Sequence, residues 1–130
     1  MLGDLIGEMK GKVTGIRVLA DRLESTVQGS GKVWGTDENE VETFTSTPRP
    51  DGSVLGEGQG LITTKDGDMI MFKGQGIGIP TGKGQAASFR GAIHYQTASQ
   101  KFVKANRTVG VFEYDIDQEG NVHGKIWEWK

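Results

Sequence analysis

Glycine occupies every second position in two stretches of the chain, residues 56–60 and 74–78, and the 130 residues contain 21 glycines in all. Successive side chains of a β-strand point to opposite faces, so each stretch would present one face without side chains. Glycine inside a strand is entropically unfavourable and is found where the strand bends sharply or where another group approaches the sheet closely. The pattern therefore predicts a strongly curved antiparallel sheet that closes into a small barrel.

Turn residues divide the chain into segments of strand length. Lys65-Asp66-Gly67 and Pro80-Thr81-Gly82 both have the form of three-residue hairpin loops with glycine in the left-handed conformation. No segment shows the apolar repeat of a long helix, and we expect only one helical turn, within residues 98–105. We predict an all-β fold, a single antiparallel meander-type β-barrel of about eight strands that forms one domain over residues 1–130. The expected strands are 8–19, 22–34, 39–47, 53–64, 68–79, 83–97, 107–117 and 121–129.

Composition excludes several classes of function. The chain has no cysteine, which rules out disulfides, thiolate metal sites and cysteine nucleophiles. Its 15 basic and 17 acidic residues are interspersed and give a net charge of −2, so there is no electrostatic basis for binding nucleic acid or an anionic membrane. No run approaches the roughly 20 apolar residues of a membrane helix, and residues 1–10 do not have the pattern of a signal peptide. We therefore expect a cytoplasmic protein with no nucleic-acid or membrane partner.

Cofactor and metal motifs are absent from the sequence. The two histidines, His94 and His123, lie on different predicted strands and have no metal-ligand spacing. Neither glycine stretch opens a helix, as a phosphate-binding loop would, and no serine has the context of a nucleophile elbow. We predict no metal and no cofactor. The acidic stretch 37–42 is interpreted as a solvated turn that leads into a strand.

The last predicted hairpin indicates which of its faces is inside. Gln118-Glu119-Gly120 marks its turn, and with Asp117 opposite Asn121 the face that carries Tyr114 and Ile126 is apolar, whereas the other face carries charged pairs. The inward face then ends at Glu128, near Tyr114. Burial raises the pKa of a carboxyl group towards neutrality, so Glu128 and Tyr114 are the candidate catalytic acid–base pair.

The outer face of the same hairpin carries an apolar patch. An exposed patch of this kind is typical of association, and symmetric self-association is the commonest form. We predict a homo-oligomer whose interface includes Val109, Val111, Trp127 and Trp129.

The central strands leave two alternatives for the inside of the barrel. The loop at residues 65–67 sets Glu57 opposite Gln75 and Gln59 opposite Lys73, and the loop at residues 80–82 sets Ile79 opposite Lys83. Most large apolar residues fall on the same face as these four, namely Leu55, Leu61, Met69, Met71, Ile77, Ile79, Phe89, Ile93 and Tyr95. We predict that this face is inside, where a few polar groups would orient a mostly apolar guest. The candidate ligand-binding residues are then Glu57, Gln59, Lys73, Gln75, Gln85 and Tyr95. The alternative places the glycines inside, which gives a cavity lined by backbone and leaves the polar groups in water.

The overall layout resembles the small antiparallel barrels grouped as calycin-like and allene-oxide-cyclase-like. The resemblance is carried by the glycine-punctuated hairpins and by Phe112-Glu113-Tyr114, which leads into a closing hairpin that ends Ile126-Trp127-Glu128-Trp129. The Gly-x-Trp signature of lipocalins is missing, since Val33-Trp34-Gly35 has a different order, and no catalytic motif of the cyclases is matched. The resemblance implies a barrel fold and small apolar molecules as ligands.

Three functions follow from these observations. The first is a barrel that binds a small, largely apolar molecule. The second is an enzyme of cyclase or isomerase type that uses Glu128 and Tyr114 in the barrel cavity. The third is a structural, self-assembling domain whose interior is packed solid. We favour the first.

Overall fold

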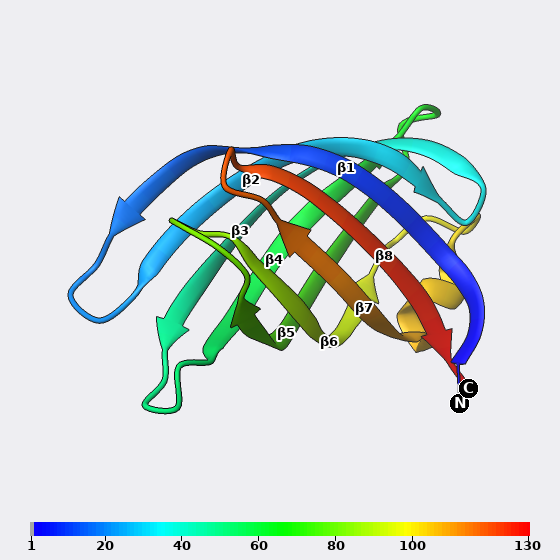
Figure 1. The fold of residues 1–130 in the computed structure, drawn as a ribbon. Coiled ribbons are helices and arrows are strands. Elements are labelled where there is room, and N and C mark those ends of the chain that lie inside the picture. Colours follow the sequence, from blue (N-terminus) through cyan, green and yellow to red (C-terminus); the bar gives the residue numbers. More distant parts are fainter. Residues whose placement is uncertain (1) are drawn as a thin grey trace.

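Every strand of the structure pairs with its predecessor in the sequence, and the last strand pairs with the first, which closes the sheet into a barrel (Figure 1). The computed structural model describes residues 2–130. All pairings are antiparallel, so the predicted meander barrel of eight strands is confirmed. The strands are β1 (Leu2–Val18), β2 (Leu23–Val33), β3 (Thr36–Pro48), β4 (Val54–Thr64), β5 (Met69–Pro80), β6 (Ala87–Gln96), β7 (Val109–Ile116) and β8 (Asn121–Trp129), with the 3₁₀ helix η1 (Val103–Arg107) between β6 and β7.

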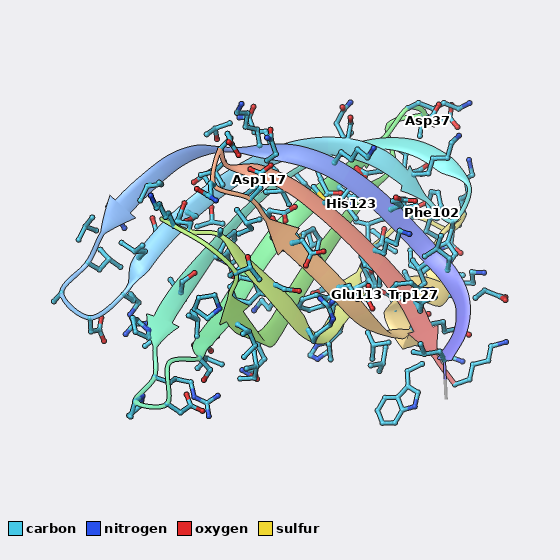
Figure 2. All side chains as sticks on the ribbon, in the orientation of Figure 1. Asp37, Phe102, Glu113, Asp117, His123 and Trp127 are labelled. Carbon is cyan, nitrogen blue, oxygen red and sulfur yellow. The ribbon has the colours of Figure 1, made fainter. Side chains whose placement is uncertain are left out.

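The two ends of the barrel differ. One end carries the connections 19–22, 49–53, 81–86 and 117–120, and the opposite end carries η1 and both ends of the described chain (Figure 1). Phe102, just before η1, is buried and lies at this second end (Figure 2). Its ring is 6.2 Å from that of Trp34, which in turn contacts Tyr95 at 5.3 Å. These three rings close the η1 end.

Trp34 reaches this position through an unusual backbone conformation. Trp34 and Gly35 have φ values of 46° and 76° and form the two-residue turn between Val33 and Thr36. A turn of this kind needs positive φ at both central residues, which favours Asn-Gly and disfavours tryptophan. The left-handed conformation costs a non-glycine residue about 1–3 kcal/mol, which the ring contacts of Trp34 offset. The sequence alone gave no partner for this residue.

Two of the predicted hairpin registers are confirmed. Glu57 pairs with Gln75 and Gln59 with Lys73, and Gly67 has the left-handed φ of 90° that the loop requires. In the last hairpin the predicted inner face is also inside, as the burial of Ile116 and Val122 shows.

The register predicted between β5 and β6 is wrong. Ile79 pairs with Ser88, five residues beyond the predicted partner Lys83, because the connection runs through residues 81–86. A shift by an odd number of residues moves every side chain to the opposite face. Phe89, Ile93 and Tyr95 therefore lie on the same face as the glycines. This face is inside, and Met69, Met71, Ile77 and Ile79, which were expected inside, are exposed.

Close approach of aromatic rings explains several glycines of the inner face. A Cβ atom added to Gly78 would lie 2.5 Å from the ring of Phe89, and one added to Gly60 would overlap the ring of Phe72. Close approach of a neighbouring strand explains others, since a Cβ at Gly11 would lie 2.5 Å from the carbonyl oxygen of Gln28 on β2. These contacts are of the close-approach kind that the sequence pattern suggested.

Two apolar clusters fill the two halves of the barrel, and Phe112 packs against both. Their buried members are Ile6, Val33, Ile62, Ile70, Ile93, Tyr95, Phe102 and Ala105 towards η1, and Met9, Val27, Ala87, Phe89, Ile116 and Val122 towards the other end.

Candidate ligand-binding cavity

A cavity of about 110 Å³ lies inside the barrel and is bounded by residues of both apolar clusters. Along the middle of β4 and β5 its wall contains Gly56, Gly58, Gly74 and Gly76, which bring the backbone to the surface of the cavity. The rest of the wall includes large apolar side chains: Met9, Phe44, Ile62, Phe72, Phe89, Ile93, Phe112 and Ile126. Phe44 holds two of the other rings in edge-on contact, Phe89 at 6.3 Å and Tyr114 at 5.9 Å. The cavity is thus a small apolar space with aromatic walls.

A row of three glutamates enters the barrel from β3. Glu38, Glu40 and Glu42 stand at alternate positions of the strand, so all three point inwards. Glu38 and Glu42 are only 5% and 7% exposed, and Glu40 and Glu42 line the cavity. The interpretation of residues 37–42 as a solvated turn is therefore wrong, because β3 begins at Thr36 and this stretch belongs to it. The alternation of glutamate with other residues, continued by Phe44 on the same face, is the sequence signal that would have found the row.

Hydrogen bonding satisfies only part of this acidic row. The hydroxyl of Tyr114 donates to Oε2 of Glu42 at 2.8 Å. Among residues 2–130, the buried side-chain oxygens left without a hydrogen-bond partner are Oε2 of Glu38, Oε1 of Glu42 and the hydroxyl of Tyr95. None of the three glutamates forms an ion pair with a lysine, arginine or histidine in this part of the chain.

Burial raises the pKa values of Glu38 and Glu40, so these carboxyl groups are harder to ionise than exposed ones. It raises the pKa of Glu40 well above its ordinary value, and the neighbouring carboxyl groups of Glu42 and Glu38 add to this shift. Burial raises the pKa of Glu38 as well. The pKa values of Tyr95 and Tyr114 are also raised by burial, with a further contribution from the nearby glutamates. Glu40 therefore keeps its proton to a higher pH than an exposed glutamate does.

Four of the predicted ligand-binding residues have their side chains on the outer surface, although Glu57, Gln59 and Gln75 also border the cavity. Glu57, Gln59, Lys73 and Gln75 are exposed, because the glycines that alternate with them face inwards. The prediction of an interior polar cluster was wrong for the reason given above, the misplaced register of β6. The four side chains do come together, but on the outer surface, where they border a groove of about 520 Å³ with His94.

The other two predicted ligand-binding residues lie at different depths. Tyr95 is 6% exposed and lines the cavity, so its predicted interior position is confirmed. Gln85 lies in the β5–β6 connection and not in the cavity. Its Nε2 donates to Oγ of the fully buried Ser25 at 2.7 Å, which ties this connection to β2 at the end of the barrel opposite η1.

The predicted acid–base pair is not formed. Tyr114 pairs with Gly124, four residues from Glu128, a separation of about 13 Å along the strand. Glu128 does not line the cavity, and its carboxylate lies 3.9 Å from Nζ of Lys130. The carboxylate that meets Tyr114 is Glu42, from a strand that the sequence did not associate with it.

The predicted interface residues lie on the outside of β7 and β8. Trp129 and Val109 are exposed, and Val111 and Trp127, which is labelled in Figure 2, are half-buried. The pairing of β1 with β8 extends this apolar patch to Leu2 and Leu5. Self-association through the patch stays a prediction.

Two further properties concern residues 2–130. No three histidine, aspartate or glutamate side chains in this range are arranged to hold a metal ion. No helix in it has the length and apolar character needed to cross a lipid bilayer.

Comparison with known proteins gives the fold and no activity. No protein-family model and no curated protein matches the chain. Among solved structures, a β-barrel-like protein from Acinetobacter baumannii AYE is similar with a TM-score of 0.84 and 14% identity over 100% of this chain and 96% of that one. A protein of unknown function from Clostridium acetobutylicum ATCC 824 gives 0.80 and 17% over 98% of each chain. A conserved protein of unknown function from Rhodopseudomonas palustris gives 0.78 and 12% over 98% of this chain and 97% of that one. At these identities the likeness establishes a shared small β-barrel fold and nothing about activity.

Proposed function

We propose that the protein binds a small, largely apolar molecule inside the barrel. One observation carries this proposal: the cavity has apolar walls, and buried oxygens of Glu42 and Tyr95 at its boundary have no partner within residues 2–130. An apolar space with a few convergent polar groups is the usual form of a small-molecule site.

The energetics argue against a barrel that serves only as a solid scaffold. An empty cavity of 110 Å³ destabilises a core by about 3 kcal/mol, at roughly 24 cal/mol per Å³. Each buried polar group without a hydrogen bond costs about 1–3 kcal/mol more. A bound molecule that filled the space and met the free oxygens would remove both penalties.

Catalysis has less support than binding. The cyclase or isomerase alternative needed Glu128 beside Tyr114, and these residues are separated along the barrel. We therefore propose a binding protein, and we retain from the composition the proposal that it works in the cytoplasm.

Titration with toluene, followed by the NMR signals of the Ile62 and Ile93 methyl groups, tests the proposal. Both groups line the cavity, so saturable shifts are expected in them. Ile126→Phe enlarges a side chain of the cavity wall and should abolish these shifts. Ile77→Phe makes the same change on the outer face of β5 and should leave them intact. Absence of any interior shift, or equal binding by the two variants, would contradict the proposal. Native mass spectrometry of the purified protein adds a search for a molecule that is already bound.

A further inference from the structure

The polar part of the cavity wall has more hydrogen-bond acceptors than hydrogen-bond donors. Among the polar side chains of residues 2–130 that line the inside, Glu40 and Glu42 supply carboxyl oxygens, and the hydroxyls of Tyr95 and Tyr114 are the donors besides a proton on Glu40. Tyr114 is already engaged with Glu42. A guest that met this wall with hydrogen-bond donors would be complementary to it.

The acidic row does not stand alone as an indication of a site. Tyr95 comes from β6, is 6% exposed and borders the same cavity, and its hydroxyl has no partner among the described residues. Burial raises the pKa of Tyr95, and the nearby charges of Glu40 and Glu38 raise it further. The Tyr95 hydroxyl is therefore close enough to these carboxyl groups to interact with them. Two strands thus bring unpaired polar atoms to one small space.

Protonation of the row by itself leaves these groups unsatisfied. A single proton on Glu40 lets that carboxyl donate one hydrogen bond, to one neighbouring carboxylate. Oxygens of the other carboxyl groups and the hydroxyl of Tyr95 are then still without partners. The strands paired with β3 offer no compensating charge, since Glu40 lies opposite Gly29 on β2 and Ile62 on β4.

We propose that the guest is a small organic cation, an amine on an apolar or aromatic body, whose ammonium group is held by Glu42 and Glu40 and whose body packs on the phenylalanine rings. The proposal rests on the proposed function and adds the chemical class of the ligand. A buried carboxylate is stabilised by a cation that hydrogen-bonds to it, and aromatic faces attract the same charge.

Cavity size limits the guest. An engineered cavity of about 150 Å³ binds benzene, so 110 Å³ suits a single ring, and the polar group of the guest has to lie among the carboxyl oxygens of Glu40 and Glu42 at the cavity boundary. Benzylamine, benzyl alcohol and benzoate form a matched series in which the ring is constant and the charge is positive, zero or negative.

The test is calorimetric or NMR titration of the protein with these three compounds at pH 7. Benzylamine is expected to bind at least about tenfold more tightly than benzyl alcohol, the effect of a hydrogen bond to a charged group, and benzoate is expected not to bind. Glu42→Gln keeps an acceptor for Tyr114 but removes the charge, and should erase the preference while sparing benzyl alcohol. Glu57→Gln makes the same change on the outer surface and should leave the preference intact.

A pH series adds a second readout. The titratable groups that face Glu40 are Glu38 and Glu42 on its own strand, Tyr95 on β6 and Tyr114 on β7. A proton on Glu40 competes with the cation, so benzylamine affinity should rise between pH 5 and pH 8 while benzyl alcohol affinity stays constant.

The outcomes separate the two proposals. If benzyl alcohol and toluene bind but benzylamine binds no more tightly, the cation proposal is wrong and the binding function stands. If benzoate binds best, the sign of the recognised charge is the opposite of that proposed. If none of the compounds reaches the interior, both proposals fail.

Discussion

The hydroxyl of Tyr114 and the carboxylate of Glu42 form a hydrogen bond of 2.8 Å that crosses the inside of the barrel. Tyr114 belongs to β7 and Glu42 to β3, strands that stand on opposite sides of the closed eight-stranded sheet. The two residues are 72 positions apart in the sequence. This bond fixes the separation of the two walls at the cavity and gives one buried carboxylate oxygen its partner.

Loss of this bond should destabilise the protein. Tyr114→Phe deprives the buried Oε2 of Glu42 of the donor that it has in the wild type, and the expected loss is about 1–3 kcal/mol in the free energy of unfolding, measured by urea denaturation. Tyr95→Phe is the matched control, since it removes a buried hydroxyl without a partner in the described chain and should leave the ligand-free protein unchanged or more stable. Equal losses in the two variants would contradict the role given to the bond.

Stability should fall as the pH rises above the ordinary pKa of glutamate. The pKa of Glu40 is raised well above 4.5, so the folded state retains a proton that the unfolded state releases. The stabilisation is complete below about pH 4.5 and is lost as the pH passes through the raised pKa. Urea midpoints between pH 4.5 and pH 9 should therefore decline in the wild type. The decline should be reduced in Glu40→Gln, and unchanged in Glu57→Gln; an identical slope in all three proteins would show that Glu40 does not cause it.

Two glycines of β1 should respond differently to the same substitution. A Cβ at Gly11 would lie 2.5 Å from the carbonyl oxygen of Gln28 and 2.9 Å from Cα of Gly29, both backbone atoms that cannot move freely. Gly11→Ala should cost about 1–3 kcal/mol or more by overpacking. Gly15→Ala meets nothing within 4 Å and should be close to neutral. Thermal melts of the two variants compare them directly, and similar melting temperatures would argue against close strand approach as the reason for Gly11.

If the apolar patch on the outside of β7 and β8 is a subunit interface, a polar substitution in it should weaken the oligomer. Trp129 is 59% exposed, so Trp129→Ser removes apolar surface without disturbing the core. We expect the mass measured by light scattering to shift towards that of a monomer. Ile16→Ser, an exposed residue elsewhere on β1, is the control and should keep the mass of the wild type. A wild-type protein that is already monomeric would refute self-association through this patch.

Short turns made much of the fold predictable from the sequence. Gly67 and Gly120 each take the left-handed conformation at the place that the pattern indicates, and the registers of β4 with β5 and of β7 with β8 follow from them. The face of the last hairpin could be assigned because its two sides differ clearly in polarity. The overall barrel then required only that the remaining segments also be strands.

The connection between β5 and β6 was not predictable in the same way. It contains both Gly82 and Gly84, and either could end a tight turn; the left-handed residue is Gly84, with a φ of 64°. Choosing Gly82 gave a register that differed by an odd number of residues, which reversed the inside and outside of β6. This single error moved the candidate site to the wrong face of the sheet.

The functional residues were missed for a related reason. Glutamate is rarely buried without a partner, so composition favours placing Glu38, Glu40 and Glu42 in water. Their alternation, continued by Phe44 on the same face, is a local signal, but the hydrogen bond that accommodates Glu42 inside comes from Tyr114 across the barrel, and the local sequence does not show that contact.

The glycine wall of β4 and β5 limits how the cavity can change in evolution. A Cβ atom at Gly56 would lie 2.9 Å from the ring of Phe89, and one at Gly58 would lie 2.7 Å from Cβ of Phe44, so a side chain at either position would overlap the opposing wall. New ligand preferences would have to arise from replacements among the opposing rings and the acidic row. We therefore expect proteins of this fold to conserve the cavity glycines of β4 and β5. Sequence differences that change the ligand should occur at the positions of the opposing rings and of the acidic row.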